Sequence, residues 1–117
     1  MSADAPASTA ETIYVMDRVT LRPGMLEPYR RAWQERYLPA ARARGMQLVH
    51  AWVTPPVEVS GESNQVIHVW ALPDVAAFWA MRGRAGADPG VAAWWQETER
   101  YALRRERCFL SGEVVPD

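Results

Sequence analysis

Two histidines and one aspartate are the residues of this chain best suited to move protons. His50 and His68 each stand two residues before a tryptophan, Trp52 and Trp70, in segments of strand-like composition. Side chains two apart on a strand point to the same face. If the strand register places both pairs on one covered face, they form an aromatic pocket with two imidazoles, one serving as base and the other as acid. The alternative is that each histidine is a core residue of the fold.

Asp17 lies in the middle of an apolar, β-branched segment. A carboxylate there is costly to bury unless it is paired. Arg18 cannot be its partner, because adjacent residues on a strand face opposite ways. We therefore expect Asp17 to orient a histidine, to act as a base itself, or to form a structural ion pair. Glu113 is a similar but weaker candidate, because it stands near the chain end, where solvent reaches it.

Aromatic residues supply the expected walls of a ligand site. We expect Trp52, Trp70 and Trp33 to contact an apolar substrate and Tyr14 to offer its phenol to a bound carbonyl. Tyr37 and Tyr29 fall on a helical stripe and are interpreted as core. Two histidines with Asp17 would make a two-histidine, one-carboxylate metal set, but no tight spacing supports one. We expect no metal and no bound organic cofactor.

Composition limits the kind of partner. The chain has 117 residues, a formal net charge of −1, and 13 cationic residues that are all arginine. No basic field is present to hold a nucleic acid, and no lysine can form a Schiff base. The apolar stretches are far shorter than the ~20 residues of a membrane span. The single cysteine, Cys108, excludes an intrachain disulfide and fits a cytoplasmic protein; we expect it to be buried in a strand.

The pattern of apolar residues and turn residues predicts one α+β domain. Residues 1–11 are expected to be a disordered tail, and residues 12–117 a single domain. Pro39 should kink or break the first helix near Leu38, and the glycines of residues 82–87 should interrupt the second helical region. Asp88-Pro89 is expected to start the next helix. The predicted strands are residues 12–21, 46–54, 65–72 and 107–115, and the first helix begins at Leu26.

The resulting order, β-α-β-β-α-β, is the ferredoxin-like arrangement: a four-stranded antiparallel sheet with helices on one face. The second and third strands carry apolar residues on both faces, whereas one chain has helices for only one. A second copy packed sheet against sheet would cover the other face. The sequence therefore predicts a homodimer, and the alternative is a monomer with an exposed apolar sheet.

Two short motifs resemble a known family. The run Asn64-Gln65-Val66-Ile67-His68-Val69-Trp70, preceded by Trp52-Val53-Thr54, resembles the NIPSNAP family of the dimeric α+β barrel superfamily. The turn Thr20-Leu21-Arg22-Pro23-Gly24 matches the family's threonine-leucine-basic-proline-glycine opening. The resemblance implies a barrel made from two sheets, with a pocket in each subunit between sheet and helices.

The resemblance implies no single reaction. The wider superfamily includes isomerases, polyketide cyclases, cofactor-free monooxygenases, haem-degrading enzymes and dehydratases. The family's first strand usually carries a glutamate, an arginine and a tyrosine at alternate positions, where this chain has Val15, Asp17 and Val19. A function that depends on that arginine would not carry over.

Together these features favour an enzyme that applies acid-base chemistry to an apolar or aromatic metabolite, as an isomerase, cyclase or lyase. His50 would move the proton, Asp17 would orient it, and His68 would be a second polar group. A cofactor-independent monooxygenase is a close variant. The rival hypothesis is a non-catalytic dimer that binds a small ligand or a protein. An enzyme requires His50 and Asp17 within reach of one cavity, whereas a binder requires only the tryptophans.

Overall fold

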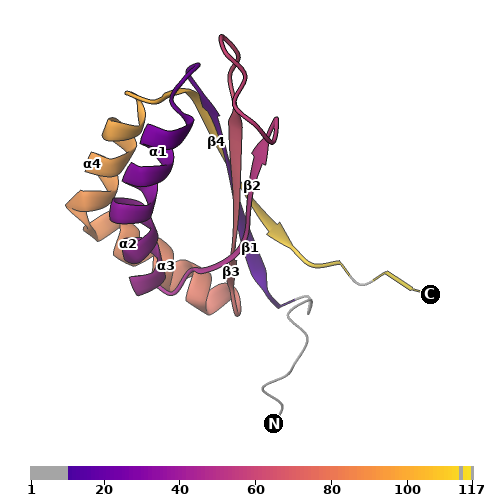
Figure 1. The fold of residues 1–117 in the computed structure, drawn as a ribbon. Coiled ribbons are helices and arrows are strands. Elements are labelled where there is room, and N and C mark those ends of the chain that lie inside the picture. Colours follow the sequence, from indigo (N-terminus) through magenta and orange to yellow (C-terminus); the bar gives the residue numbers. More distant parts are fainter. Residues whose placement is uncertain (1–10, 114, 117) are drawn as a thin grey trace.

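The computed structural model describes residues 11–113 and 115–116, so the tail predicted for residues 1–11 lies outside them except for Glu11. Helices cover one face of a sheet, and the other face is left open in the single chain (Figure 1). The strands are β1 (Ile13–Leu21), β2 (Gln47–Thr54), β3 (Gln65–Leu72) and β4 (Ala102–Ser111). The helical segments are α1 (Leu26–Ala32), η1 (Trp33–Tyr37), α2 (Leu38–Ala43), α3 (Val75–Ala87) and α4 (Pro89–Thr98).

The four strands form one antiparallel sheet in the order β2-β3-β1-β4. The first and third strands are therefore central, and the second and fourth lie at the edges. This confirms the predicted ferredoxin-like arrangement of the chain. Among the described residues, no helix combines the length and apolar composition that crossing a bilayer requires.

The first helical region differs from the prediction at Pro39. The helix does not break near Leu38; it continues into α2 after a π-helical segment, η1. The amide of Leu38 donates to the carbonyl of Trp33, five residues earlier. Proline lacks an amide hydrogen and crowds the preceding turn, and a widened turn is one way for a helix to pass it. The segment between Trp33 and Tyr37 therefore has π geometry, and both of these residues are buried.

The second helical region is also longer than predicted. α3 continues through Gly83 and Gly86 to Ala87, so the expected break over residues 82–87 is absent. Each glycine in a helix costs only about 1 kcal/mol, and other contacts can offset that amount. α3 gains a cap, because the Asp74 carboxylate accepts a hydrogen bond of 2.7 Å from the Ala77 amide. The predicted start of α4 is confirmed, since Asp88 caps it through the Gly90 amide at 2.8 Å.

A β-bulge in β2 decides which face its residues occupy. Leu48 pairs with Trp70, but His50 pairs with Val69, so one extra residue stands between them. Because side chains alternate along a strand, this one-residue shift moves every later residue of β2 to the opposite face. Trp52 consequently pairs with Ile67 rather than with a residue of the helix-covered face.

The helix-facing side of the sheet carries the core. In β3 the residues at alternate positions from Val66 to Leu72 are buried, and Trp70 is fully so. The open side carries half-buried apolar residues of the central strands, Met16, Ile67 and Val69 among them. Cys108 lies opposite Met16 and is exposed, which corrects the expectation of a buried cysteine. The reason is that β4 is an edge strand in which Arg105, Arg107 and Phe109 face the helices, so Cys108 faces the open side.

Candidate functional site

Three polar residues stand in one row across the helix-facing side of the sheet. Asp17 of β1 pairs directly with His68 of β3 and, on its other side, with Arg107 of β4. Side chains that oppose each other across neighbouring strands have Cβ atoms about 4.5–5.5 Å apart. The register therefore brings a base, a carboxylate and a guanidinium together beneath the helices.

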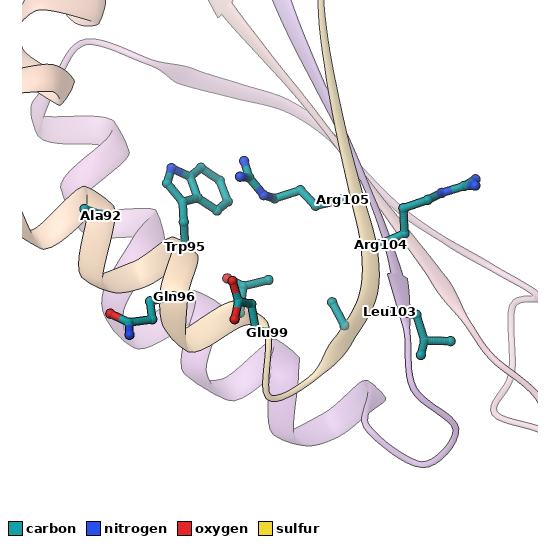
Figure 2. Close-up of a pocket in the computed structure, with 9 residues that line it drawn as sticks. Ala92, Trp95, Gln96, Glu99, Leu103, Arg104 and Arg105 are labelled. Carbon is teal, nitrogen blue, oxygen red and sulfur yellow. The ribbon is translucent and has the colours of Figure 1, made fainter.

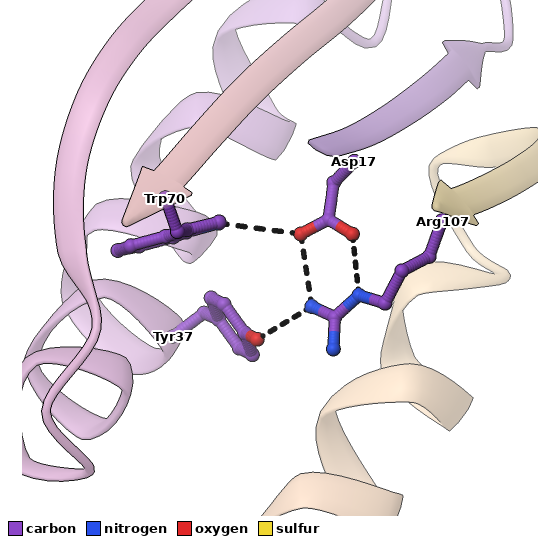
Figure 3. A network of polar contacts seen from close by, with 4 residues as sticks. All are labelled: Asp17, Tyr37, Trp70 and Arg107. Atoms are coloured by element: carbon purple, nitrogen blue, oxygen red, sulfur yellow. Dashed lines mark hydrogen bonds and ion pairs between the residues drawn. The ribbon is translucent and has the colours of Figure 1, made fainter. Parts of the chain in front are cut away.

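Asp17 and Arg107 form a bidentate ion pair (Figure 3). Arg107 donates through Nε to Oδ1 of Asp17 at 2.6 Å and through Nη2 to Oδ2 at 2.9 Å. Trp70 Nε1 donates to Oδ2 at 3.3 Å, and Arg107 Nη2 also donates to the hydroxyl of Tyr37 at 3.0 Å. Asp17 is only 5% exposed, so these donors replace the water that the carboxylate lost on folding.

The two partners affect each other's charge. Burial lowers the pKa of Arg107, but the hydrogen bond and the negative charge of Asp17 outweigh it and raise the pKa above its usual value. Arg107 is therefore a permanent cation at this position. A buried pair of this kind holds its geometry because removing one partner would leave the other charge uncompensated.

His68 is held neutral at the other end of the row. Its ring stacks on Trp33 with centroids 3.9 Å apart and planes 8° from parallel. Burial lowers the pKa of His68 to about 4, and the nearby Asp17 charge opposes part of that effect. At neutral pH the imidazole is thus in the form that accepts a proton.

A small cavity of about 110 Å³ opens beside His68, between the first helical region and the β2 edge. We call it the His68 cavity. Trp33 and Trp52 belong to its lining, and Gln34 and Arg30 bring polar groups from the helices. The remaining lining residues are Ala51, Val53 and Val66. The cavity thus combines one imidazole with aromatic and aliphatic walls.

The structure separates His50 from His68. The expected pocket with two imidazoles required both residues on the helix-covered face, and the bulge in β2 places His50 opposite Val69 on the open face. His50 is exposed and stacks on Trp52, with ring centroids 4.3 Å apart. The predicted pocket with two imidazoles is therefore corrected to a pocket that contains His68 alone. The extra residue in β2 reverses which face of the sheet the later side chains of that strand occupy.

The other predicted site residues divide between the two faces. Trp33 lines the His68 cavity from the helical side, whereas Trp52 borders it from the β2 edge with its side chain on the open face beside His50. The Trp70 indole N–H donates a hydrogen bond to Asp17. Tyr14 pairs with Ala71, and its position in β1 places it on the open face with Met16. Among the described residues, no group of three or more histidine, cysteine, aspartate or glutamate side chains is arranged to hold a metal ion.

Sequence reasoning missed Arg107 and Tyr37. Arg107 was placed only at the start of a predicted strand, whereas β4 begins at Ala102 and brings Arg107 opposite Asp17. Tyr37 was assigned to the core; it is buried, yet its hydroxyl accepts a hydrogen bond from Arg107. The available signal was the buried Asp17 itself, which demands a cation from a neighbouring strand.

The fold and the site define a class of protein. It is a ferredoxin-like α+β domain with a row of polar residues buried between the sheet and the helices. Comparison with protein families narrows the class. The NIPSNAP family model matches residues 14–111, and the chain belongs to that family. No curated protein matches the chain in a sequence search.

Solved structures agree on the fold. A NIPSNAP domain protein from Burkholderia xenovorans is 23% identical with a TM-score of 0.66, over 90% of this chain and 99% of that one. A NIPSNAP family protein from Agrobacterium tumefaciens is 19% identical with a TM-score of 0.69, over 90% and 89%. SnoaB from Streptomyces nogalater, a cofactor-independent oxygenase crystallised as a point mutant, is 20% identical with a TM-score of 0.55, over 92% and 100%. At these identities the likeness describes the fold alone.

Proposed function

We propose that this protein is an enzyme that applies acid-base chemistry to a small apolar or aromatic metabolite bound at the His68 cavity. His68 accepts the proton, and Asp17 stabilises the imidazolium that results. Trp33 contacts the substrate, and Trp52 borders the cavity at the β2 edge. The observation that carries the proposal is the direct pairing of Asp17 with His68, with the imidazole neutral and beside a cavity.

The proposed step is removal of a proton from a carbon next to a carbonyl group. The C–H electron pair moves into the carbonyl to give an enolate, and the proton goes to His68. Return of that proton to a different carbon gives isomerisation; attack of the enolate on a second carbonyl gives cyclisation; loss of a β-leaving group gives elimination. Each outcome needs a base, a charge that stabilises its conjugate acid, and a donor for the enolate oxygen, a role that Arg30 or Gln34 of the cavity lining would fill.

Asp17 is suited to the stabilising role more than to that of the base. Both of its oxygens accept hydrogen bonds, from Arg107 and Trp70, so neither is free to take a proton from a substrate. Its charge still acts on His68 through space, where it favours the protonated form. The proposal therefore gives the proton-transfer role to His68 and leaves His50 outside the reacting centre.

Deuterium exchange tests this proposal without knowledge of the natural substrate. A panel of aromatic ketones is incubated with the protein in D₂O at neutral pH, and loss of the α-proton signals is followed by NMR. We expect exchange above the buffer rate with the native protein, loss of the excess rate in His68→Gln, and its retention in the matched control His50→Gln. Saturable binding of the panel with no exchange in any member would instead favour a non-catalytic binding protein.

A cofactor-independent monooxygenase is the second candidate. It is favoured by the likeness to SnoaB, which extends over the whole of that chain and 92% of this one. Such an enzyme also begins by removing a proton from the substrate, and the carbanion then reduces oxygen. An oxygen electrode separates the two, because the proposed acid-base reactions consume no oxygen.

We further propose that the protein is a cytoplasmic homodimer. The open face carries half-buried apolar residues on its two central strands, Met16, Ile67 and Val69, with no helix above them in the part of the chain that the structure describes. Packing of two such faces buries both sets of residues and leaves the His68 cavity on the far, helix-covered side of each sheet. The single cysteine, Cys108, supports the location, because it has no second cysteine in the chain with which to form a disulfide.

A further inference from the structure

A larger cavity lies at the opposite end of the polar row, where Arg107 ends it. This cavity measures about 420 Å³ and lies between β4 and the two C-terminal helices. We call it the Arg107 cavity. It is separate from the His68 cavity and shares no lining residue with it. Its lining consists of Met81, Arg82, Ala85, Gly86, Val91, Trp95, Arg107 and Phe109.

The charge of the Arg107 cavity is of one sign. Arg82 and Arg107 line it, and none of its described lining residues is acidic. Arg82 lies over the Phe109 ring at 5.3 Å and has no ion-pair partner among the described residues. The charge of Arg107 is balanced by Asp17, so Arg82 supplies the uncompensated positive charge that attracts an anion.

Arg107 has one donor left for a ligand. Asp17 and Tyr37 occupy its Nε and Nη2, while Nη1 makes no hydrogen bond to any described residue. Figure 3 shows Nη1 on the side of the guanidinium that faces away from Asp17. The Arg107 side chain retains 21% exposure, so solvent reaches it from the cavity. The ion pair with Asp17 thus holds the guanidinium plane in place and leaves Nη1 available.

Trp95 contributes a flat aromatic ring to the Arg107 cavity. It lines the Arg107 cavity and also a neighbouring hollow of about 590 Å³. In that hollow Arg105 faces Trp95 across the gap between β4 and α4 (Figure 2), with its Cζ 3.9 Å from the ring centroid. Arg107 lies 5.2 Å from the same ring. Trp95 is half-buried, and Arg105, Arg107 and the Tyr37 ring already contact it, so the part of the indole that lines the Arg107 cavity acts as a fixed apolar wall.

We propose that the Arg107 cavity binds a small carboxylate with a flat, aromatic body. The carboxylate accepts hydrogen bonds from Nη1 of Arg107 and from the Arg82 guanidinium, and the body lies against Trp95 and Phe109. Guanidinium groups are the preferred protein donors to carboxylates because their geometry matches. The proposal is independent of the acid-base site, because the two cavities lie at opposite ends of the row.

The test compares two probes of equal shape, 2-naphthoate and its neutral amide, 2-naphthamide. Binding is measured by calorimetry, and the site is located by NMR shifts of the Trp95 indole N–H. We expect 2-naphthoate to bind at least about tenfold more tightly than the amide, since a hydrogen bond to a charged group is the stronger kind. Arg82→Gln, an exposed substitution, should weaken 2-naphthoate about fivefold or more, whereas the control Arg42→Gln on α2 should leave its affinity unchanged.

Equal affinity for both probes at Trp95 would overturn the anion preference while confirming a cavity. Binding of neither probe at Trp95, or equal effects of Arg82→Gln and Arg42→Gln, would overturn the site. None of these results alters the deuterium-exchange test of the His68 cavity, so failure of one proposal is distinguishable from failure of the other.

Discussion

Asp17 and Arg107 face each other across β1 and β4 and bind through two nearly parallel hydrogen bonds, of 2.6 and 2.9 Å. This pair joins two regions with different chemistry. On one side Asp17 acts on a neutral His68 beside a small cavity, and on the other Arg107 presents a donor to a larger one. The charge balance of the buried row therefore affects both stability and any reaction.

The first prediction concerns stability. Arg107→Gln leaves the buried Asp17 without a cation and should lower the free energy of unfolding by about 3–5 kcal/mol. Arg104→Gln is the matched control on the same strand, where Arg104 lies 3.7 Å from Glu106 with both side chains more than half exposed. It should cost less than about 1 kcal/mol. Urea denaturation measures the free energy of unfolding of both variants. Equal decreases would show that the Asp17–Arg107 ion pair contributes no more to stability than an exposed one.

The second prediction concerns acid. His68 has a pKa of about 4 in the folded protein, below the ordinary value of 6.5. The unfolded chain therefore binds a proton first as pH falls, which favours unfolding. Stability contributed by neutral His68 is complete above about pH 6.5 and is lost toward pH 4, by roughly 3 kcal/mol at the lower end. His68→Phe, which keeps an aromatic ring against Trp33, should have a flatter stability profile between these pH values.

That comparison is made by urea denaturation at several pH values with both proteins. The carboxylates of the chain contribute acid sensitivity to both, so only the difference between the two profiles reports on His68. Identical profiles would mean that His68 is solvated and titrates normally.

The third prediction concerns assembly. Val69→Glu places a charge in the centre of the open face and should convert the proposed dimer to a monomer in analytical ultracentrifugation, because a carboxylate cannot be buried there unpaired. Arg31→Glu, on the exposed side of α1, is the control and should leave the dimer intact. Cys108 lies on the open face and gives a second readout. Its reaction with a thiol reagent should be slow in the native protein and fast in Val69→Glu; a native monomer would contradict the proposal.

Much of the fold could be predicted from local patterns. The third strand, residues 65–72, agrees with the structure residue for residue, because its β-branched composition and its flanking turn residues mark both ends. The Asp88 cap was likewise readable from a short motif. Such features depend on neighbours in the chain, and the sequence contains them directly.

The site could be predicted only in part, because it depends on register. Asp17 was identified by its cost in an apolar strand, but its partner Arg107 lies 90 residues further along the chain. The bulge in β2 places His50 and His68 on opposite faces of the sheet. It is a one-residue irregularity, and no glycine or proline in the strand indicates its position. At Pro39 the sequence predicts a kink or a break, whereas the structure has a continuous helix with a π-helical turn that includes Trp33, the residue that stacks on His68. Long-range pairing decided each of these outcomes.

The most direct test of the central claim, that Asp17 and His68 act as a coupled pair, is an NMR pH titration of the two histidine side chains with and without Asp17→Asn. The structure predicts that His68 titrates near pH 4 and that its midpoint moves to still lower pH in Asp17→Asn, because the charge that raises its pKa is removed. His50 lies on the opposite face, and its signals serve as the internal reference. A His68 that titrates near 6.5 and does not respond to Asp17→Asn would contradict the coupled pair and, with it, the proposed acid-base site.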